Sequence, residues 1–192
     1  YFSGFNQNVF VEYGASNILI WNNVIVGDPT HTNGTDRAMS ISARTNTWTG
    51  SFVVANNTMA GFVTASAIND ATTLLGLPGL VFGNNVCVDS RWFMASASES
   101  LLDASNLYYH SGAQFYDSNG NPVSAPADPF DGSSVVGNPG FLTDYRIPST
   151  SPARGIGSDQ SAWFTVDFGG RSRSVPWDAG AWEFVGSAAT AV

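Results

Sequence analysis

The sequence predicts an all-β protein built from stacked repeats. Four segments place an asparagine at the same point between two short apolar runs, and these residues are Asn23, Asn57, Asn85 and Asn106. The spacings between them are 34, 28 and 21 residues. Such spacings are typical of stacked repeats, each of which buries its apolar face only against its neighbours. Only residues 65–77 show a helical pattern, and a weak one, so we expect mostly strand and loop.

The apolar positions around each asparagine predict which side chains point inward. Alternate side chains of a strand lie on opposite faces, so the positions two after, three before and five before the asparagine share one face. Eleven of these twelve side chains are apolar or aromatic, and the exception is Asp103. In chain order the positions hold Ile18, Ile20, Ile25, Phe52, Val54, Met59, Leu80, Phe82, Cys87, Leu101, Asp103 and Tyr108. We expect them to line the interior, and the repeats to end near Tyr109.

The recurrence of asparagine has two physical explanations that act together. The residue falls between two strands, where the chain must bend, and asparagine tolerates the left-handed backbone region better than most residues. Asparagine side chains of stacked repeats can also hydrogen-bond to one another. We therefore expect Asn23, Asn57, Asn85 and Asn106 to form both the turns and a structural ladder.

Composition excludes two classes of partner. Only 11% of the residues are charged, and 15 acidic residues against seven basic ones, all arginine, give a formal net charge of −8. Nucleic acids and anionic membrane surfaces are bound by cationic side chains, so we expect neither as a partner. No apolar stretch approaches the roughly 20 residues of a membrane span. The single cysteine, Cys87, lies in an apolar run, which favours a buried side chain and excludes a disulfide framework within the chain.

The sequence favours an extracellular or cell-surface location. The sequons Asn33-Gly34-Thr35 and Asn56-Asn57-Thr58 permit N-glycosylation in a secreted protein. The chain starts without a signal peptide or an initiator methionine, which indicates a processed or excised product.

Five short motifs follow one another in the C-terminal third. They are Asn138-Pro139-Gly140-Phe141, Asp144-Tyr145-Arg146-Ile147, Ser151-Pro152-Ala153-Arg154-Gly155-Ile156-Gly157, Asp167-Phe168-Gly169-Gly170-Arg171 and Asp178-Ala179-Gly180-Ala181-Trp182-Glu183-Phe184. In this order they resemble the closing segment of secreted bacterial proteins of the choice-of-anchor type, in the pectate-lyase-like superfamily. The resemblance implies a right-handed parallel β-helix, a solenoid with coils in residues 1–114. Residues 115–192 are then an irregular closing segment packed on the same solenoid, within a single domain.

One motif departs from the family pattern. Where the family reads Ile-Asp-Ala-Gly, this chain reads Arg154-Gly155-Ile156-Gly157 and has no acidic residue. We expect Arg154 and Asp178 together to replace the missing anchor. Proteins of this fold include polysaccharide lyases, glycoside hydrolases, epimerases and adhesins, so the fold by itself assigns no reaction.

The sequence offers few residues that suit lyase chemistry. The resemblance implies proton abstraction beside a uronate carboxylate, usually by lysine or arginine, with a cation that neutralises the substrate. The chain has no lysine, and its coil region holds only Arg37, Arg44 and Arg91. A guanidinium acts as a base only in an unusual environment, which disfavours a lyase.

Glycoside hydrolysis requires two carboxyl groups about 5 to 9.5 Å apart. Asp70 and Asp89 lie near the expected coil edges, and Asp28 and Asp36 lie in one loop, so each pair is a candidate. The alternative is that each aspartate caps a turn.

The densest polar group lies in the loop of residues 27–48. Asp28, His31, Asp36 and Arg37 have the residue types for acid and base catalysis or for a metal site. Their spacing is irregular, so an ordinary solvated loop is the alternative.

A calcium site is a further candidate, although no cofactor is required. Asp117, Asn119 and Asn121 place oxygen ligands at alternate positions, but the bidentate glutamate of a calcium loop is lacking. Asp128 and Asp131 are candidates for the missing ligands. The alternative is a turn rich in Asp and Asn.

Aromatic side chains suggest a carbohydrate surface. Exposed Trp48 and Trp92 would stack on sugar rings, with packing in the core as the alternative.

The expected ends of the repeat stack differ. The segment from Phe115 onward is long and aromatic enough to cover one end, whereas residues 6–13 read as an uncovered strand at the other. Either the coil continues upstream in a longer protein, or another subunit stacks there. We therefore expect an extracellular, non-catalytic, structural or adhesive module that self-associates end to end into filaments and contacts glycans. The alternative is a polysaccharide-active enzyme, a lyase or a glycoside hydrolase.

Overall fold

The regular structure of the protein is entirely β-strand in the residues that the computed structural model describes. These residues are 2–3, 7–12, 16–28, 30, 37–42, 49–62, 66–69, 80–89, 92–94, 102–112, 115–116, 122–123 and 133–186. The strands are β1 (Phe2–Ser3), β2 (Gln7–Glu12), β3 (Ser16–Trp21), β4 (Val24–Val26), β5 (Arg37–Ser42), β6 (Thr49–Ala55), β7 (Thr58–Ala60), β8 (Ser66–Asn69), β9 (Leu80–Gly83), β10 (Val86–Val88), β11 (Trp92–Met94), β12 (Leu102–Ala104), β13 (Leu107–Tyr109), β14 (Phe115–Tyr116), β15 (Pro122–Val123) and β16 (Val135–Val136). The predicted all-β class is confirmed for these ranges, in which no helix suited to crossing a membrane is found.

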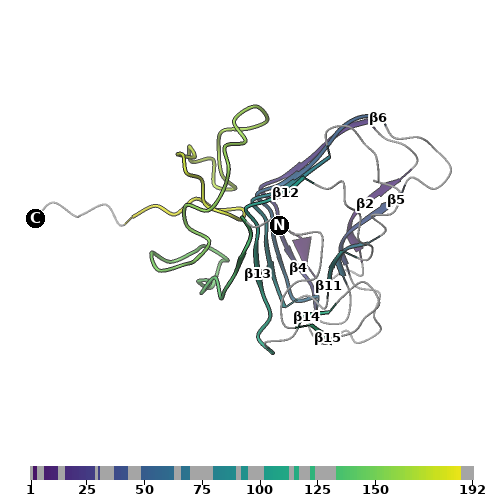
Figure 1. The fold of residues 1–192 in the computed structure, drawn as a ribbon, viewed down its shortest axis with the longest axis horizontal. Helices are drawn as coiled ribbons and strands as arrows, with labels where there is room; N and C mark the ends of the chain where they lie inside the picture. Colours follow the sequence, from purple (N-terminus) through teal and green to yellow (C-terminus); the bar gives the residue numbers. More distant parts are fainter. Residues whose placement is uncertain are drawn as a thin grey trace, which may run out of the picture.

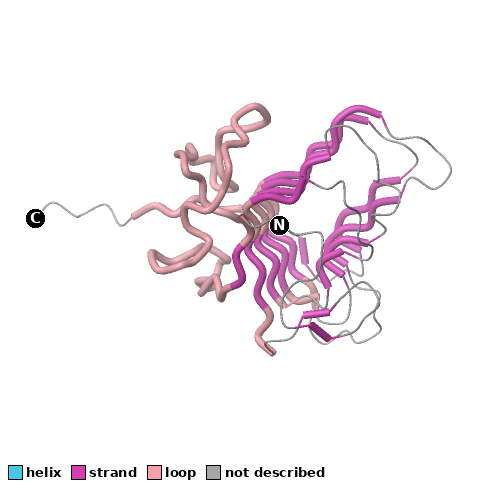
Figure 2. Tube along the Cα trace, in the orientation of Figure 1, coloured by secondary structure: helices cyan, strands magenta, loops and turns pink. Residues whose placement is uncertain are grey.

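Successive strands enter three parallel sheets in rotation. Sheet A has the order β1-β4-β7-β10-β13-β16, sheet B has β2-β5-β8-β11, and sheet C has β3-β6-β9-β12. A separate antiparallel pair joins β14 to β15. Figures 1 and 2 show the strands of each sheet stacked on one another, with a long segment of loop beside sheets A and C.

The predicted inward columns are confirmed by the strand register. In sheet A, Ile25 pairs with Met59, Met59 with Cys87, and Cys87 with Tyr108. In sheet C, the columns join Ile18, Phe52 and Leu80, and Ile20, Val54, Phe82 and Asp103. Those with described side chains are buried, as in Ile25 and Met59 at 0% exposure, except Ile18, which is partly buried. Leu101 and the side chains of Leu80 and Asp103 lie outside the described residues.

Four asparagines form a hydrogen-bonded row inside the turns between sheets C and A. Asn23 donates from its backbone N and its Nδ2 to Oδ1 of Asn57, both at 3.0 Å. Asn57 makes the same pair of bonds to Asn85, at 3.0 and 3.1 Å, and Asn85 makes it to Asn106, at 2.7 and 3.1 Å. Each Oδ1 of the last three asparagines therefore accepts two hydrogen bonds from the preceding repeat. Because Asn57, Asn85 and Asn106 are fully buried, these amides would be costly to leave unsatisfied.

The bend itself belongs to the residue before each of these asparagines. Asn22, Asn56, Asn84 and Ser105 have φ between 52° and 60°, in the left-handed region. The second asparagines are not among the described residues with positive φ. The expectation that one asparagine both bends the chain and forms the ladder was therefore wrong: the left-handed backbone falls on the first position, and the continuous row of four asparagines is formed at the second.

Sheet A continues for one strand beyond the last asparagine, past the expected end near Tyr109. Leu107 pairs with Val135 and Tyr108 with Val136, so β16 extends the sheet. Ser134 Oγ accepts a hydrogen bond from Asn106 N at 3.2 Å, and Ser133 Oγ accepts one from Ser105 N at 2.9 Å. A serine hydroxyl thus replaces the asparagine oxygen in the next turn.

Residues 137–186 are the part of the expected closing segment that follows β16, and they are called the closing segment from here on. They lie along the row of turns and not across an end of the stack (Figure 1). Ile147, Ala153 and Ala179 of this segment pack in one apolar cluster with residues of sheet A such as Val86 and Leu107. In a second cluster, Phe164 and Trp177 pack on Val53 and Ala55 of sheet C. The expectation that this segment covers one end does not hold for its described part. The division of the chain at residue 114 stays a prediction.

Replacing Asn85 by Ala should lower the free energy of unfolding by about 2–4 kcal/mol, since it removes the side-chain acceptor of Asn57 N and the side-chain donor to the carbonyl of Val54, both of which are buried. Urea denaturation measures this loss. The control is Asn138→Ala, which removes one exposed hydrogen bond to Gly140 N and should cost less than about 1 kcal/mol. Equal losses for the two variants would contradict a stabilising role of the row.

Candidate functional site

A buried arginine joins the closing segment to the first turn of the row. Arg173 donates from Nη1 to Glu183 Oε2 at 3.1 Å, and from Nη2 to Asn22 Oδ1 at 2.7 Å. Nη2 also reaches the carbonyl oxygens of Gly180, at 2.9 Å, and Ala181, at 3.1 Å. Asn22 in turn donates from Nδ2 to the carbonyl of Val166. One guanidinium therefore ties together the turn after β3 and two stretches of the closing segment.

The first residues of the next two turns, Asn56 and Asn84, also hydrogen-bond to the closing segment. Asn56 Nδ2 donates to the carbonyl of Asp178 at 2.9 Å, and Asn84 exchanges hydrogen bonds with the backbone of Ser158, at 2.7 and 2.9 Å. Gly180 has φ of 93°, and a Cβ there would lie 2.9 Å from Thr58 Oγ1. The next residue, Ala181, donates its N–H to that hydroxyl at 3.0 Å. A residue without a side chain is thus required where the closing segment crosses sheet A.

Burial dominates the electrostatics of this junction. It lowers the pKa of Arg173, although Glu183 and Asp167 act in the opposite direction. Burial also raises the pKa of Glu183, and the nearby Asp178 raises it further. The pairing of Arg173 with Glu183 at 3.1 Å offsets part of the cost of burying the two groups.

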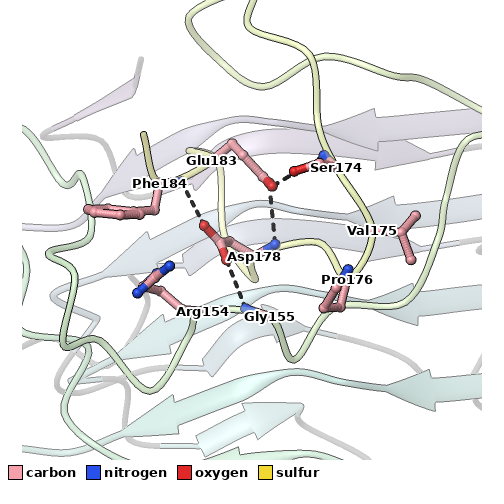
Figure 3. A pocket seen from close by; sticks show the side chains of 8 residues that line it. All are labelled: Arg154, Gly155, Ser174, Val175, Pro176, Asp178, Glu183 and Phe184. Atoms are coloured by element: carbon pink, nitrogen blue, oxygen red, sulfur yellow. Dashed lines mark hydrogen bonds between the residues drawn. The ribbon is translucent and has the colours of Figure 1, made fainter. Parts of the chain in front are cut away.

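The carboxylates of the junction hold backbone groups. Asp178 accepts from Gly155 N at 2.8 Å and from Phe184 N at 2.6 Å, as Figure 3 shows. Glu183 accepts from Ser174 N and Asp178 N, both at 3.3 Å. Asp178 therefore anchors the loop at Gly155, in line with the expected replacement of the missing family aspartate. Its expected partner Arg154 contributes differently, by donating to the carbonyl of Ser149 at 2.7 Å and lying 4.2 Å from the ring centroid of Phe184.

A pocket of about 420 Å³ opens over this junction (Figure 3). Arg154, Ser174, Asp178, Glu183 and Phe184 are among its lining residues. Both carboxylates are nearly buried, at 6% and 7% exposure, and are occupied by hydrogen-bond donors. They are poorly suited to proton transfer, so the chemistry this arrangement supports is binding.

Asp28 and Asp89 both lie just beyond the carboxyl ends of strands of sheet A. Asp28 follows β4, Asp89 follows β10, and β7 lies between these strands. Two strand spacings separate their backbones by roughly 10 Å, and the register places Asp28 one residue beyond the level of Asp89. Asp28 Oδ1 accepts from Thr30 N at 2.8 Å, and Asp89 Oδ1 from Ser111 N at 2.6 Å. These are the contacts of turn-capping residues, and a catalytic use of either stays a prediction.

The remaining predicted site residues fall outside the described part of the chain. His31, Asp36, Asp70, Trp48, Asp117, Asn119 and Asn121 are in this group. Trp92 lies in β11, but its side chain is not described. Among the residues that are described, no three of His, Cys, Asp and Glu are placed to hold a metal ion.

Comparison with protein-family models, with curated proteins and with solved structures finds no match to this chain.

Sequence reasoning missed Arg173 and Glu183. The only available signal was that Glu183 falls within the last closing motif and that Arg173 lies between the last two motifs. Arg171, two residues earlier, is exposed and looks identical in sequence, so burial separates the two only once the fold is known.

Replacing Arg173 by Met should lower the free energy of unfolding by about 3–5 kcal/mol, because it leaves Glu183 buried without its cation. Arg173→Lys should restore part of this loss, since it keeps the charge. Arg171→Met is the matched control and should cost less than about 1 kcal/mol. Chemical denaturation of the three variants tests this, and a similar loss for both Met variants would contradict the role of Arg173.

The raised pKa of Glu183 predicts a pH dependence of stability. A carboxyl whose pKa is higher in the folded state binds more protons there, so its contribution is full below the ordinary value of 4.5 and is lost as pH rises through the raised pKa. Glu183→Gln lacks this contribution. The Tm of the native protein minus that of the variant should therefore fall as the pH rises above about 4.5 in thermal unfolding scans. A difference that grows with pH would contradict the raised pKa.

Proposed function

We propose that this chain is a non-catalytic extracellular module, a right-handed parallel β-helix with a structural or adhesive role. The rotation of strands through three parallel sheets supports the β-helix, because each turn of such a solenoid contributes one strand to every sheet. The in-register columns and the asparagine row support it further, since both repeat at each turn.

The observation that carries the non-catalytic role is how the buried carboxylates are used. In the described ranges, the buried acidic residues are Asp167, Asp178 and Glu183. Each of them accepts hydrogen bonds from backbone N–H groups of the closing segment. A catalytic carboxyl needs at least one oxygen within reach of a substrate. These groups instead hold the backbone of the closing segment in place.

End-to-end association is the second part of the proposal. The strands β1, β2 and β3 stand at the same end of sheets A, B and C, and each pairs with one strand of the described chain. An open strand edge is a template for another chain, and head-to-tail contacts of this kind propagate into filaments. The self-association that we propose uses this edge.

Replacing Ser16 by Lys tests the edge. Ser16 is exposed on β3, and lysine on an edge strand opposes pairing with another chain. Mass photometry over a range of concentrations should show oligomers of the native protein that Ser16→Lys reduces. The control is Ser149→Lys, the same change at an exposed position of the closing segment.

Two results would contradict association at this edge: a native protein that is monomeric at every concentration, and an equal effect of the two lysine variants.

The alternative function is that of a polysaccharide-active enzyme, a lyase or a glycoside hydrolase. The observation in its favour is that Asp28 and Asp89 share one edge of sheet A. A screen of pectin, alginate and neutral glycans, with and without calcium, decides between the two functions. Release of unsaturated or reducing ends that is lost on changing Asp28, Asp36, Asp70 or Asp89 to Ala would overturn the non-catalytic proposal.

Calcium binding at residues 117–121 and glycan contacts at Trp48 and Trp92 remain predictions. The non-catalytic proposal requires neither.

A further inference from the structure

The asparagine row has a direction, and its first member lacks the donors that the others have. Asn57, Asn85 and Asn106 each accept two hydrogen bonds at Oδ1 from the preceding turn. Asn23 heads the row, and in the described part of the chain no group donates to its Oδ1. Its side chain is only partly buried, whereas the other three are fully buried. The row therefore begins with an acceptor that has room for two donors from a further turn.

The short strand β1 covers β4 without reaching this acceptor. The pairing of β1 with β4 starts at Ile25, so no described residue stands opposite Asn23 or Val24 on that side of the sheet. In each later turn, the residue after the asparagine donates its backbone N–H to the carbonyl of the asparagine one turn earlier, as Thr58 does to Asn23 at 2.8 Å. Val24 holds that position in the first turn and is 1% exposed. A backbone donor and a side-chain acceptor are thus both placed to meet one more turn.

The opposite end of the stack carries the groups that this position requires. Ser134 stands one turn after Asn106, in the place of an asparagine, and its Oγ accepts from Asn106 N at 3.2 Å. A hydroxyl that accepts a hydrogen bond can still donate its own proton. The strand that follows, β16, pairs with β13 and with no other strand among the described residues. Ser134 therefore offers an O–H and a backbone N–H as donors, and its carbonyl as an acceptor.

An apolar column of the interior is also open at this end. Ile25, Met59, Cys87 and Tyr108 follow one another in register, and Val136 is next in line. The first four have strands on both sides and are at most 4% exposed, whereas Val136 is 54% exposed. Covering Val136 with another strand would remove apolar surface from water, which favours association.

We propose that the two ends join head to tail, with β16 of one copy taking the place of β1 against β4 of the next copy. In the register of the other turns, Ser134 then stands opposite Asn23, and Val136 stands opposite Ile25. Ser134 donates from N and Oγ to Asn23 Oδ1, so the row continues from one copy into the next. β1 has only two residues, and within one copy it competes for the same place. This inference rests on the proposed end-to-end association and names the strand that meets each end.

Replacing Val136 by Lys tests the β16 end. Val136 is exposed in the single chain, which therefore tolerates lysine, but between joined copies the charge would be buried in the apolar column. Sedimentation velocity over a range of concentrations should show association weakened by about tenfold or more. The control is Val175→Lys, the same change at a valine of the closing segment that is 68% exposed, and it should leave association unchanged.

Mixing two variants tests whether the contact is head to tail. Val136→Lys keeps a native β4 end, and Ser16→Lys keeps a native β16 end. An equimolar mixture should therefore form dimers that neither variant forms alone, without longer oligomers.

Replacing Phe2 by Pro tests the displacement of β1. Proline removes a backbone donor and weakens strand pairing. If β16 competes with β1, association should occur at about tenfold lower concentration than in the native protein. If β16 instead stacks on β1, the same variant should associate more weakly.

Three results would overturn the proposal: an equal effect of Val136→Lys and Val175→Lys, a mixture without dimers, or weaker association of Phe2→Pro. Native oligomers that Ser16→Lys reduces and Val136→Lys does not would contradict this pairing of strands alone and leave the end-to-end association standing. If the native protein and Phe2→Pro are both monomeric at every concentration, the association and the pairing are contradicted together.

Discussion

The two-residue turn between sheets C and A is the constraint on which the rest of the structure depends. Its first residue takes a left-handed backbone conformation and points outward, and its second points inward. The turns at Asn22, Asn56 and Asn84 therefore contribute both to the row of second asparagines and to the attachment of the closing segment. The strand register on both sides follows from the repetition of this turn.

Burial of backbone polar groups beside the turns explains why the closing segment contains buried charged side chains. The closing segment brings Arg173 and three carboxylates against the sheets, and their oxygens accept from N–H groups of irregular backbone. A segment with little regular secondary structure must satisfy its backbone polar groups in another way, and buried carboxylates do this here. The pocket above this junction is lined by Asp178 and Glu183, whose carboxylates are held by these hydrogen bonds. A scaffold of this kind suits binding better than proton transfer.

The sequence predicted the interior well because a two-residue period leaves little freedom. Ile25, Met59 and Cys87 pair in register as their spacing from the asparagines requires. The next turn was missed because Ser134 carries an oxygen acceptor without being an asparagine. Adjacent asparagines such as Asn56 and Asn57 look equivalent in sequence, and only the structure shows that the first takes the left-handed backbone and that the second belongs to the row of four. Arg173 was missed because nothing local to it indicates burial. Most of the predicted catalytic, metal and carbohydrate residues lie outside the described ranges, so for them the sequence is the only guide.

The central claim is that the two positions of the turn have different tasks, and glycine substitution separates them. Glycine accepts the left-handed conformation, and the groups that Asn56 contacts have other partners. The carbonyls of Asp178 and Gly180 also receive hydrogen bonds from Arg173, and Asn84 Nδ2, which donates to Asn56 Oδ1, also donates to the carbonyl of Ser158. Asn57 Oδ1, by contrast, accepts hydrogen bonds from both the backbone N and the Nδ2 of Asn23. Free energies of unfolding of Asn56→Gly and Asn57→Gly, measured by urea denaturation, test the claim most directly. The account predicts a loss of about 1 kcal/mol for Asn56→Gly and about 2–4 kcal/mol for Asn57→Gly. Equal losses, or a larger loss for Asn56→Gly, would contradict it.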